Sequence, residues 1–390
     1  MVLLTVVVGS AGCGDGEGSV GPIPGSLSVV PGAELVAEVG GERLFQARLE
    51  DADGNLSLVT DATWSTSDPS VATSLGGGRF RAAGAGTTVV AAEADGLRAT
   101  ATLEVYLADP VEEWTAGETY TGRQDYAEYI PGTLPVVVSA PHGGLLEPDE
   151  IPDRTFGVLA TDLETQDLAR RIRAALLDRL GAAPHLVISR LDRSKLDPNR
   201  SIEEAAQDDP FAEHAWQEYH GFVDTARALV ARGYGSGLYL DIHGHGHPVD
   251  RVELGYLLSA DELGRSDEEL ASGSLAAESS VRALVASSGA SLTEVVRGEQ
   301  SLGALLQARG VRAVPSPSEP DPAGEPYFTG GYSTRRHGSR DGGTVSGIQL
   351  EHHFDGLRDT PENRTTYAGV LASAVEVFLR QWYPGLLPDG

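Results

Sequence analysis

Two histidine-containing motifs follow apolar segments of the sequence. Residues 139–144 read Ser-Ala-Pro-His-Gly-Gly and place His142 beside two glycines, which leave room for a substrate. Residues 241–247 contain His243, two positions after Asp241. Imidazole is a common zinc ligand, and a carboxylate behind it can orient the ring. The two motifs therefore predict a metal site; a nonfunctional loop histidine and a surface histidine cluster are the alternatives.

Two further motifs carry groups that could bind and hydrolyse a substrate. Residues 189–200 contain Arg190 and the pair Asn199 and Arg200. A guanidinium group binds a carboxylate through two hydrogen bonds, and an amide adds a donor. Glu351 ends an apolar segment, where a carboxylate can act as general base toward a metal-activated water. The alternatives are a salt-bridged loop and a solvent-facing glutamate on an edge strand.

The segments before these motifs predict the elements that position them. Apolar, β-branched segments predict strands at residues 134–139, 185–189, 237–242, 252–258 and 345–350. Thr161 with Glu164 forms a capping-box pattern ahead of an apolar helical stripe, and residues 367–378 carry a second stripe. We expect an α/β domain with a mixed, mostly parallel sheet flanked by helices, and ligands beyond the carboxyl ends of its strands.

Residues 26–107 have a different texture, with short alternating segments separated by turn sequences. This pattern predicts small antiparallel strands in a β-sandwich. Residues 63–72 and 83–90 resemble a bacterial group 2 immunoglobulin-like domain. The resemblance implies a stalk or adhesive spacer, with Trp64 in its core.

Charge and cysteine content restrict the partners of the chain. The formal net charge is −28 at pH 7, which argues against nucleic acid as a partner. Cys13 is the single cysteine, so neither an intramolecular disulfide nor a cysteine-based zinc site can form. Cys13 follows an apolar segment and small residues, and residues 1–25 resemble a bacterial lipoprotein signal and linker. We expect an exported protein, either a cell-envelope lipoprotein or a periplasmic or extracellular protein, that contacts a membrane only through a lipid on Cys13. A plain apolar N-terminus is the alternative.

The order of the four motifs within residues 108–390 resembles the N-formylglutamate amidohydrolases and, more broadly, the zinc carboxypeptidase fold. The resemblance covers about residues 134–380. It implies that His142 and His243 bind zinc and that Glu351 activates water. It also implies substrate-binding and carbonyl-polarising residues. These are Asn199 and Arg200 for a substrate carboxylate, Arg190 for the scissile carbonyl, and Tyr332 and Arg336 in a mobile substrate loop.

The second metal ligand departs from the carboxypeptidase pattern. Carboxypeptidases place a glutamate three residues after the first histidine, where this chain has Leu145. The formylglutamate family carries an aspartate farther downstream, ahead of a helix, which favours Asp162. Glu147 and Glu164 are the alternatives. We expect one Zn²⁺ per chain.

These features predict a zinc-dependent hydrolase that cleaves an amide bond of an N-acyl amino acid resembling N-formylglutamate. Its substrate would be a small molecule or peptide with a free carboxylate. An exported peptidase that acts on peptides or cell-wall fragments is the nearest alternative. A noncatalytic surface adhesin or ligand-binding lipoprotein is the alternative of another class.

Overall fold

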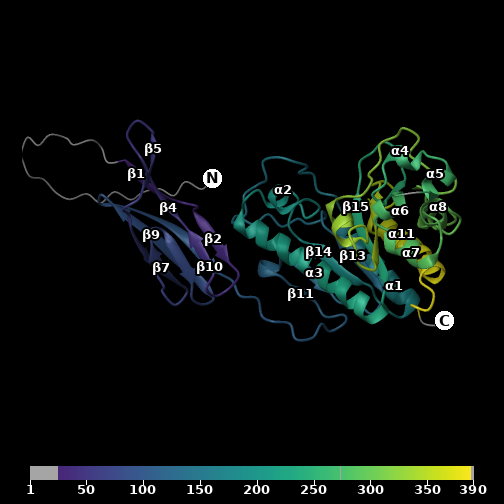
Figure 1. Ribbon diagram of the computed structural model, residues 1–390, viewed down its shortest axis with the longest axis horizontal. Coiled ribbons are helices and arrows are strands. Elements are labelled where there is room, and N and C mark those ends of the chain that lie inside the picture. The colour runs from purple at the N-terminus through teal and green to yellow at the C-terminus, as the bar shows by residue number, and fades with distance from the viewer. Residues whose placement is uncertain (1–24, 273, 388–390) are drawn as a thin grey trace, which may run out of the picture. The chain divides into compact units, whose positions relative to one another are not determined.

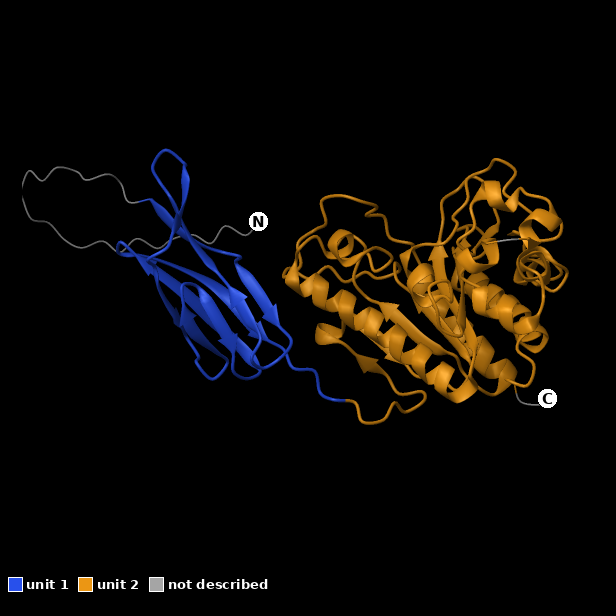
Figure 2. Ribbon diagram, in the orientation of Figure 1, with its two compact units in different colours: residues 1–110 blue, residues 111–390 orange. Residues whose placement is uncertain are grey.

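The computed structural model describes residues 25–272 and 274–387, and the chain divides into two compact units, residues 1–110 and 111–390 (Figure 2). The expected signal segment with Cys13 lies outside the described residues. No described helix is long and apolar enough to cross a membrane. The chain is mixed α/β, with one large mixed sheet and helices in the second unit and small sheets in the first.

The regular secondary structure in the described part of the first unit is β-strand alone. They form three sheets with the orders β1-β4-β5, β2-β10-β9-β6 and β3-β8-β7. All pairs are antiparallel except β2 with β10, which corrects the expectation of wholly antiparallel strands. The strands are β1 (Ser26–Val30), β2 (Ala33–Val36), β3 (Glu42–Leu44), β4 (Gln46–Glu50), β5 (Leu56–Val59), β6 (Thr63–Thr66), β7 (Ala72–Gly76), β8 (Arg79–Ala82), β9 (Gly86–Ala94) and β10 (Leu97–Val105).

Alternating burial gives the first unit its own core. In β8, Phe80 and Ala82 are buried while Arg79 and Arg81 are exposed, as the two-residue period of a strand requires. Trp64 packs against this core with its ring centroid 6.0 Å from that of Phe80, so the prediction that it is a core residue is confirmed.

The second unit contains an eight-stranded sheet with the order β11-β12-β14-β13-β15-β18-β16-β17. The four central strands β14, β13, β15 and β18 are parallel, whereas β12 and β16 run antiparallel to their central neighbours. The strands are β11 (Tyr120–Thr121), β12 (Ala127–Ile130), β13 (Val136–Ala140), β14 (His185–Ser189), β15 (Gly237–Gly244), β16 (Val252–Gly255), β17 (Ala313–Val314) and β18 (Val345–His352).

Helices surround this sheet (Figure 1). Three are long: α1 (Thr165–Leu180), α3 (Pro210–Tyr234) and α11 (Pro361–Trp382). The shorter ones are α2 (Ile202–Ala206), α4 (Ala260–Leu263), α5 (Asp267–Ala271), α6 (Leu275–Glu278), α7 (Arg282–Ser288), α8 (Leu292–Arg297), α9 (Leu302–Gln307), α10 (Tyr332–His337) and the 3-10 turn η1 (Arg123–Asp125).

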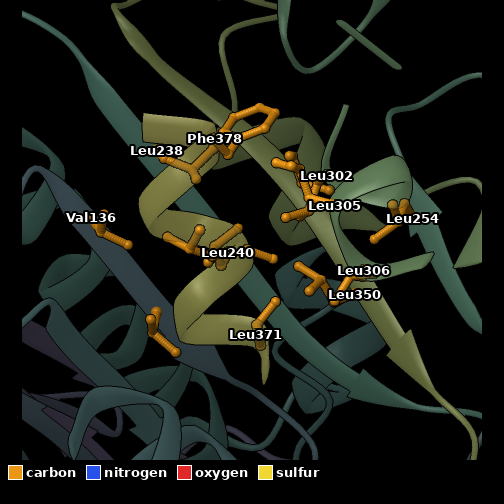
Figure 3. Close-up of a cluster of buried hydrophobic side chains, with 14 of the residues drawn as sticks. Val136, Leu238, Leu240, Leu254, Leu302, Leu305, Leu306, Leu350, Leu371 and Phe378 are labelled. Atoms are coloured by element: carbon orange, nitrogen blue, oxygen red, sulfur yellow. The ribbon is translucent and has the colours of Figure 1, made fainter. Parts of the chain in front are cut away.

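Different helices cover the two faces of the sheet because successive strand residues point to opposite sides. Val136 and Val138 of β13 share a buried cluster with residues of α1 and α11, including Leu371 and Phe378 (Figure 3). Val137, between them, packs in a second cluster with α3. The predicted helical stripes at residues 168–176 and 367–378 are therefore confirmed, since both lie against the sheet.

The predicted capping box at the start of α1 is wrong. Glu164 occupies the N-cap with a left-handed φ of 68° and makes no side-chain cap. Its carboxylate instead lies 3.2 Å from Arg364 Nη2. Thr161 donates its hydroxyl to Asp192 Oδ2 at 2.6 Å, which takes it away from the helix. The strand predicted at residues 252–258 is also shorter, because β16 ends at Gly255.

Candidate metal centre

The ends of β13, β15 and β18 place polar side chains on the α3 side of the sheet. Leu238, Leu240 and Ile242 of β15 point into the α1 and α11 cluster, so the alternate residues Asp241 and His243 point the other way. Strand pairing sets His243 beside Glu351 of β18. A shift of one residue in the pairing of β15 with β18 would turn Glu351 to the opposite face of the sheet from His243. The register therefore decides whether these two side chains can meet.

Three side chains converge at this edge. His142 follows β13, His243 lies near the end of β15, and Asp162 lies in the loop before α1; all three are buried. The Nδ1 atoms of the two histidines are 3.1 Å apart. Asp162 Oδ2 lies 3.2 Å from His142 Nδ1 and 3.3 Å from His243 Nδ1. The group could hold a metal ion.

The outer ring nitrogens of both histidines face carboxylates. His142 Nε2 lies 2.6 Å from Asp197 Oδ1, and His243 Nε2 lies 3.0 Å from Asp241 Oδ2. Burial lowers the pKa of His243, but the charge of Asp241 and the contact with Asp162 raise it well above its ordinary value. If a metal ion displaced the proton at Nδ1, each imidazole would keep its proton on Nε2, facing a carboxylate that only accepts, and would direct its Nδ1 lone pair inward. Two lone pairs and a carboxylate oxygen would then converge, an arrangement that suits a cation.

The spacing of these three atoms also suits a small cation. Ligands at the 2.0–2.1 Å typical of zinc would lie about 3.3 Å apart around a tetrahedral ion. The three distances here, 3.1, 3.2 and 3.3 Å, agree with that value. Glu147 is exposed and Glu164 pairs with Arg364, so the geometry selects Asp162 among the three predicted acids.

Glu351 lies beside this cluster, with one carboxylate oxygen in a hydrogen bond and the other without a described partner. Gln349 Nε2 donates to Glu351 Oε1 at 2.9 Å, and Gly331 N fixes Gln349 by donating to its Oε1 at 2.7 Å. Among the described residues, the buried Glu351 Oε2 has no hydrogen-bond partner. Burial raises the pKa of Glu351 to about 8; the charge of His243 lowers it, and the charge of Asp162 raises it further.

Two arginines that the sequence motifs did not single out hold the cluster together. Arg193 Nη2 lies 2.9 Å from Asp197 Oδ2, and its Nη1 lies 3.4 Å from Asp162 Oδ1. Arg358 donates to three backbone carbonyls that adjoin the site, those of Leu163, His245 and His352. The i, i+4 spacing of Arg193 and Asp197 was the available signal for the first; nothing local marks the second.

Asn199 has an amide group oriented for donation. Its Oδ1 accepts the Ser333 N–H at 2.8 Å, so its Nδ2 is identified as the donor end. That Nδ2 makes no hydrogen bond within the described part of the chain. Arg200, the next residue, has its Nε 3.1 Å from Glu204 Oε1 and retains a partly exposed side chain.

The other predicted substrate residues have their described contacts elsewhere. Arg190 Nη1 lies 3.9 Å from Asp125 Oδ2. Tyr332 and Arg336, expected in a mobile loop, lie instead on the helix α10 and pack against the Trp216 ring of α3. None of these three has a described hydrogen bond or ion pair with the metal cluster.

A second group, His245, His247 and Glu253, could also hold a metal ion. Its atoms already have partners: His245 Nε2 lies 2.8 Å from the Arg251 carbonyl, and His245 Nδ1 accepts the His247 N–H at 3.1 Å. Glu253 lies 3.0 Å from His247 and 3.6 Å from the Arg251 guanidinium. The first cluster is buried at all three residues, whereas His247 in the second group is only partly buried.

Comparisons with known proteins add distant similarities only. No protein-family model and no curated protein matches the chain. The chain is similar to the solved structure of gene product Atu2144 from Agrobacterium tumefaciens, with a TM-score of 0.40 and 14% identity over 64% of this chain and 91% of that one. It is also similar to domains 4 and 5 of the S-layer protein SbsC, with a TM-score of 0.19 and 18% identity over 22% of this chain and 53% of that one. Neither similarity assigns a function.

Proposed function

We propose that the second unit is a zinc-dependent hydrolase that cleaves an amide bond of an N-acyl amino acid. The observation that carries the proposal is the convergence of His142 Nδ1, His243 Nδ1 and Asp162 Oδ2, with both rings backed by carboxylates. Two histidines and one carboxylate are a known ligand set of catalytic zinc sites in which a position remains open for water or substrate.

The side chains around the cluster supply the remaining functions. A bound zinc ion would act as a Lewis acid on a carbonyl group and would lower the pKa of water. Glu351 Oε2 is positioned to take a proton, because Gln349 holds the other oxygen. Asn199 Nδ2 would donate to the substrate carboxylate, and Arg200 would add positive charge. Arg190 remains the predicted group for the scissile carbonyl.

The family assignments are part of the same proposal. The parallel central strands with a site at their carboxyl ends support an N-formylglutamate amidohydrolase-like domain with the zinc carboxypeptidase fold. The strands and the Trp64 core of the first unit support an immunoglobulin-like module. Export as a lipoprotein rests on the sequence around Cys13.

Exposed apolar side chains beside the site favour testing a second substrate class. Leu145 is 73% exposed three residues after His142, and Leu163 is 52% exposed next to Asp162. Phe354, three residues after Glu351, is 38% exposed. Such side chains suit an apolar acyl group or peptide, so a screen would compare N-formylglutamate with apolar N-acyl amino acids and small peptides.

Metal content tests the proposal directly. We expect about one zinc per chain by elemental analysis of the full chain, and we expect His142→Ala to lose it because one of three ligands is removed. His247→Ala is the matched control, since it removes an imidazole from the other histidine group and should keep the metal. A folded wild-type chain that takes up no zinc would instead favour a noncatalytic surface protein.

A further inference from the structure

A stacked pair of aromatic rings lies partly open to solvent in the second unit. The rings of His247 and Phe328 have centroids 4.5 Å apart and planes inclined by 16°. Phe328 is 43% exposed, and the side chain of His247 is 20% exposed. Aromatic rings stack favourably on one another, so a ring that keeps an exposed surface can receive the ring of a ligand. We call His247 and Phe328 the aromatic platform.

A buried carboxylate holds both members of the platform. Glu253 is fully buried, and its Oε1 lies 3.0 Å from His247 Nδ1. Its Oε2 accepts the N–H of Phe328 at 2.8 Å. The Nε atom of Arg251 lies 3.6 Å from Glu253 Oε1 and supplies a counter-charge. Burying a carboxylate costs free energy unless it is paired and hydrogen-bonded, and here its hydrogen bonds fix the two rings against each other.

The main chain on both sides of Phe328 is fixed as well. The hydroxyl of Tyr327 donates to the Leu254 carbonyl at 2.6 Å. The Thr329 carbonyl accepts the N–H of Leu257 at 2.6 Å. An exposed ring on an ordered segment loses little conformational entropy when a ligand binds, which favours binding.

Strand pairing places the platform on the same side of the sheet as the metal cluster. Glu253 of β16 lies opposite Glu351 of β18, which lies beside His243 of β15. Residues paired on neighbouring strands point to the same face, so these three side chains form one row. Neighbouring strands are about 4.8 Å apart, which separates His243 from Glu253 by about 10 Å. The platform lies at the Glu253 end of this row, beyond the proposed general base.

One short segment joins the platform to the predicted carboxylate-binding amide. Three residues after Phe328, Gly331 donates its N–H to Gln349 Oε1 at 2.7 Å. A Cβ at Gly331 would lie 2.3 Å from Asn199 Nδ2, so the chain passes directly against that amide group. Residues 328–331 therefore run from the platform to Asn199 along one border of the candidate site.

We propose that the aromatic platform is a subsite that binds an aromatic side chain in the acyl part of the substrate. This inference rests on the proposed function, in which Asn199 and Arg200 take the carboxylate and leave the acyl part for the platform. An extended residue spans about 3.3–3.6 Å, so a distance of about 10 Å corresponds to about three residues. The favoured substrate is a short peptide, cleaved at its last amide bond, with an aromatic side chain two or three residues before that bond.

Two N-acetylated tetrapeptides that end in glutamate, with phenylalanine or alanine as the first residue, test the proposal. By isothermal titration calorimetry, the metal-free full chain should bind the phenylalanine peptide about three- to tenfold more tightly, the usual effect of one aromatic contact. Phe328→Ala should bind both peptides equally, whereas Phe328→Tyr should keep the preference because it keeps the ring. Leu177→Ala is the matched control, since it removes an exposed apolar side chain from α1 and should keep the preference.

Hydrolysis separates this subsite from the proposed function. Loaded with zinc, the wild-type chain should show the same preference in kcat/KM. Equal or undetectable binding of the two peptides by the wild type, equal kcat/KM values, or a preference that survives in Phe328→Ala would overturn the subsite. A zinc-loaded chain that binds the phenylalanine peptide more tightly but hydrolyses neither peptide nor N-formylglutamate would support the subsite and overturn the proposed function.

Discussion

Glu351 is the residue on which the proposed chemistry depends most directly. Its free carboxylate oxygen has no partner among the described residues, while the other oxygen is held by an amide that is itself fixed by a backbone N–H. Burying an unpaired carboxylate oxygen costs free energy, and no hydrogen bond to Oε2 from the described residues offsets that cost. The arrangement is therefore suited to proton transfer.

Glu351→Gln preserves the shape of the side chain and removes its ability to accept a proton. We expect the rate of amide hydrolysis to fall by about 10²–10⁴-fold, the usual contribution of a positioned base, with zinc content unchanged. Glu147→Gln makes the same change at an exposed glutamate and should leave the rate intact. Equal rates for Glu351→Gln and the wild type would remove Glu351 from the mechanism.

The residue types and their order in the sequence predicted which residues form the metal cluster, but not all of the residues that hold them in place. His142, His243 and Asp162 come together, and Asp241 lies behind His243 as predicted. The role of Asp197 as the partner of His142 was missed, because a contact across 55 residues leaves no local pattern. Spacing can show which side chains share a strand end, whereas long-range partners depend on how loops fold back.

Strands were more predictable than helix ends at the element scale. The predicted strand at residues 185–189 coincides with β14, since every residue of it is buried and apolar content alone marks it. The start of α1 was not predictable, because Thr161 and Glu164 are bound by Asp192 and Arg364 from distant segments. Local capping patterns fail where tertiary partners compete for the capping side chain.

The first residue of β14 makes sheet stability depend on pH. His185 Nδ1 lies 2.9 Å from Tyr129 Oη and accepts the Gly132 N–H at 3.2 Å, so the folded sheet holds this ring neutral. Burial, with a smaller effect of the Arg173 charge, lowers the pKa of His185 to about 4. Below the unfolded value of about 6.5 the unfolded state binds more protons, so stability falls as the pH drops toward 4.

We expect the titration of His185 to lower the free energy of unfolding by about 2 kcal/mol when the pH falls from 7 to 5. Denaturant unfolding at both pH values measures this loss. His185→Gln should show a smaller drop, because glutamine does not titrate, and other histidines account for what remains. The same pH dependence in both proteins would contradict this assignment.

At the scale of the whole molecule, each unit has its own buried core. The first is built on Phe45 and Phe80, and the second on the sheet and its helices. A change in the pattern of apolar residues predicted the boundary between the two domains at residue 107. The compact units divide after Pro110. Composition could locate this boundary because, among the described residues, helices occur only in the second unit.

Separate cores predict separate folding. Residues 111–390 expressed alone should fold and bind zinc with the affinity of the full chain, since all three cluster residues lie within that unit. Circular dichroism and chelator competition check this expectation. A fragment that is unfolded, or that has lost zinc while the full chain binds it, would show that the first unit contributes to the second.

Arg358 has a consequence for how this scaffold could be changed. In the described part of the chain its guanidinium donates to main-chain oxygens, those of Leu163, His245 and His352, and it also lies over the Phe354 ring, 5.0 Å from the centroid. Gly244 leaves it space, because a Cβ there would lie 2.4 Å from the guanidinium carbon. Main-chain anchoring is indifferent to side-chain identity. Protein engineers could therefore exchange the exposed side chain at position 163 to alter selectivity while the three segments stay in place, provided that Gly244 is kept.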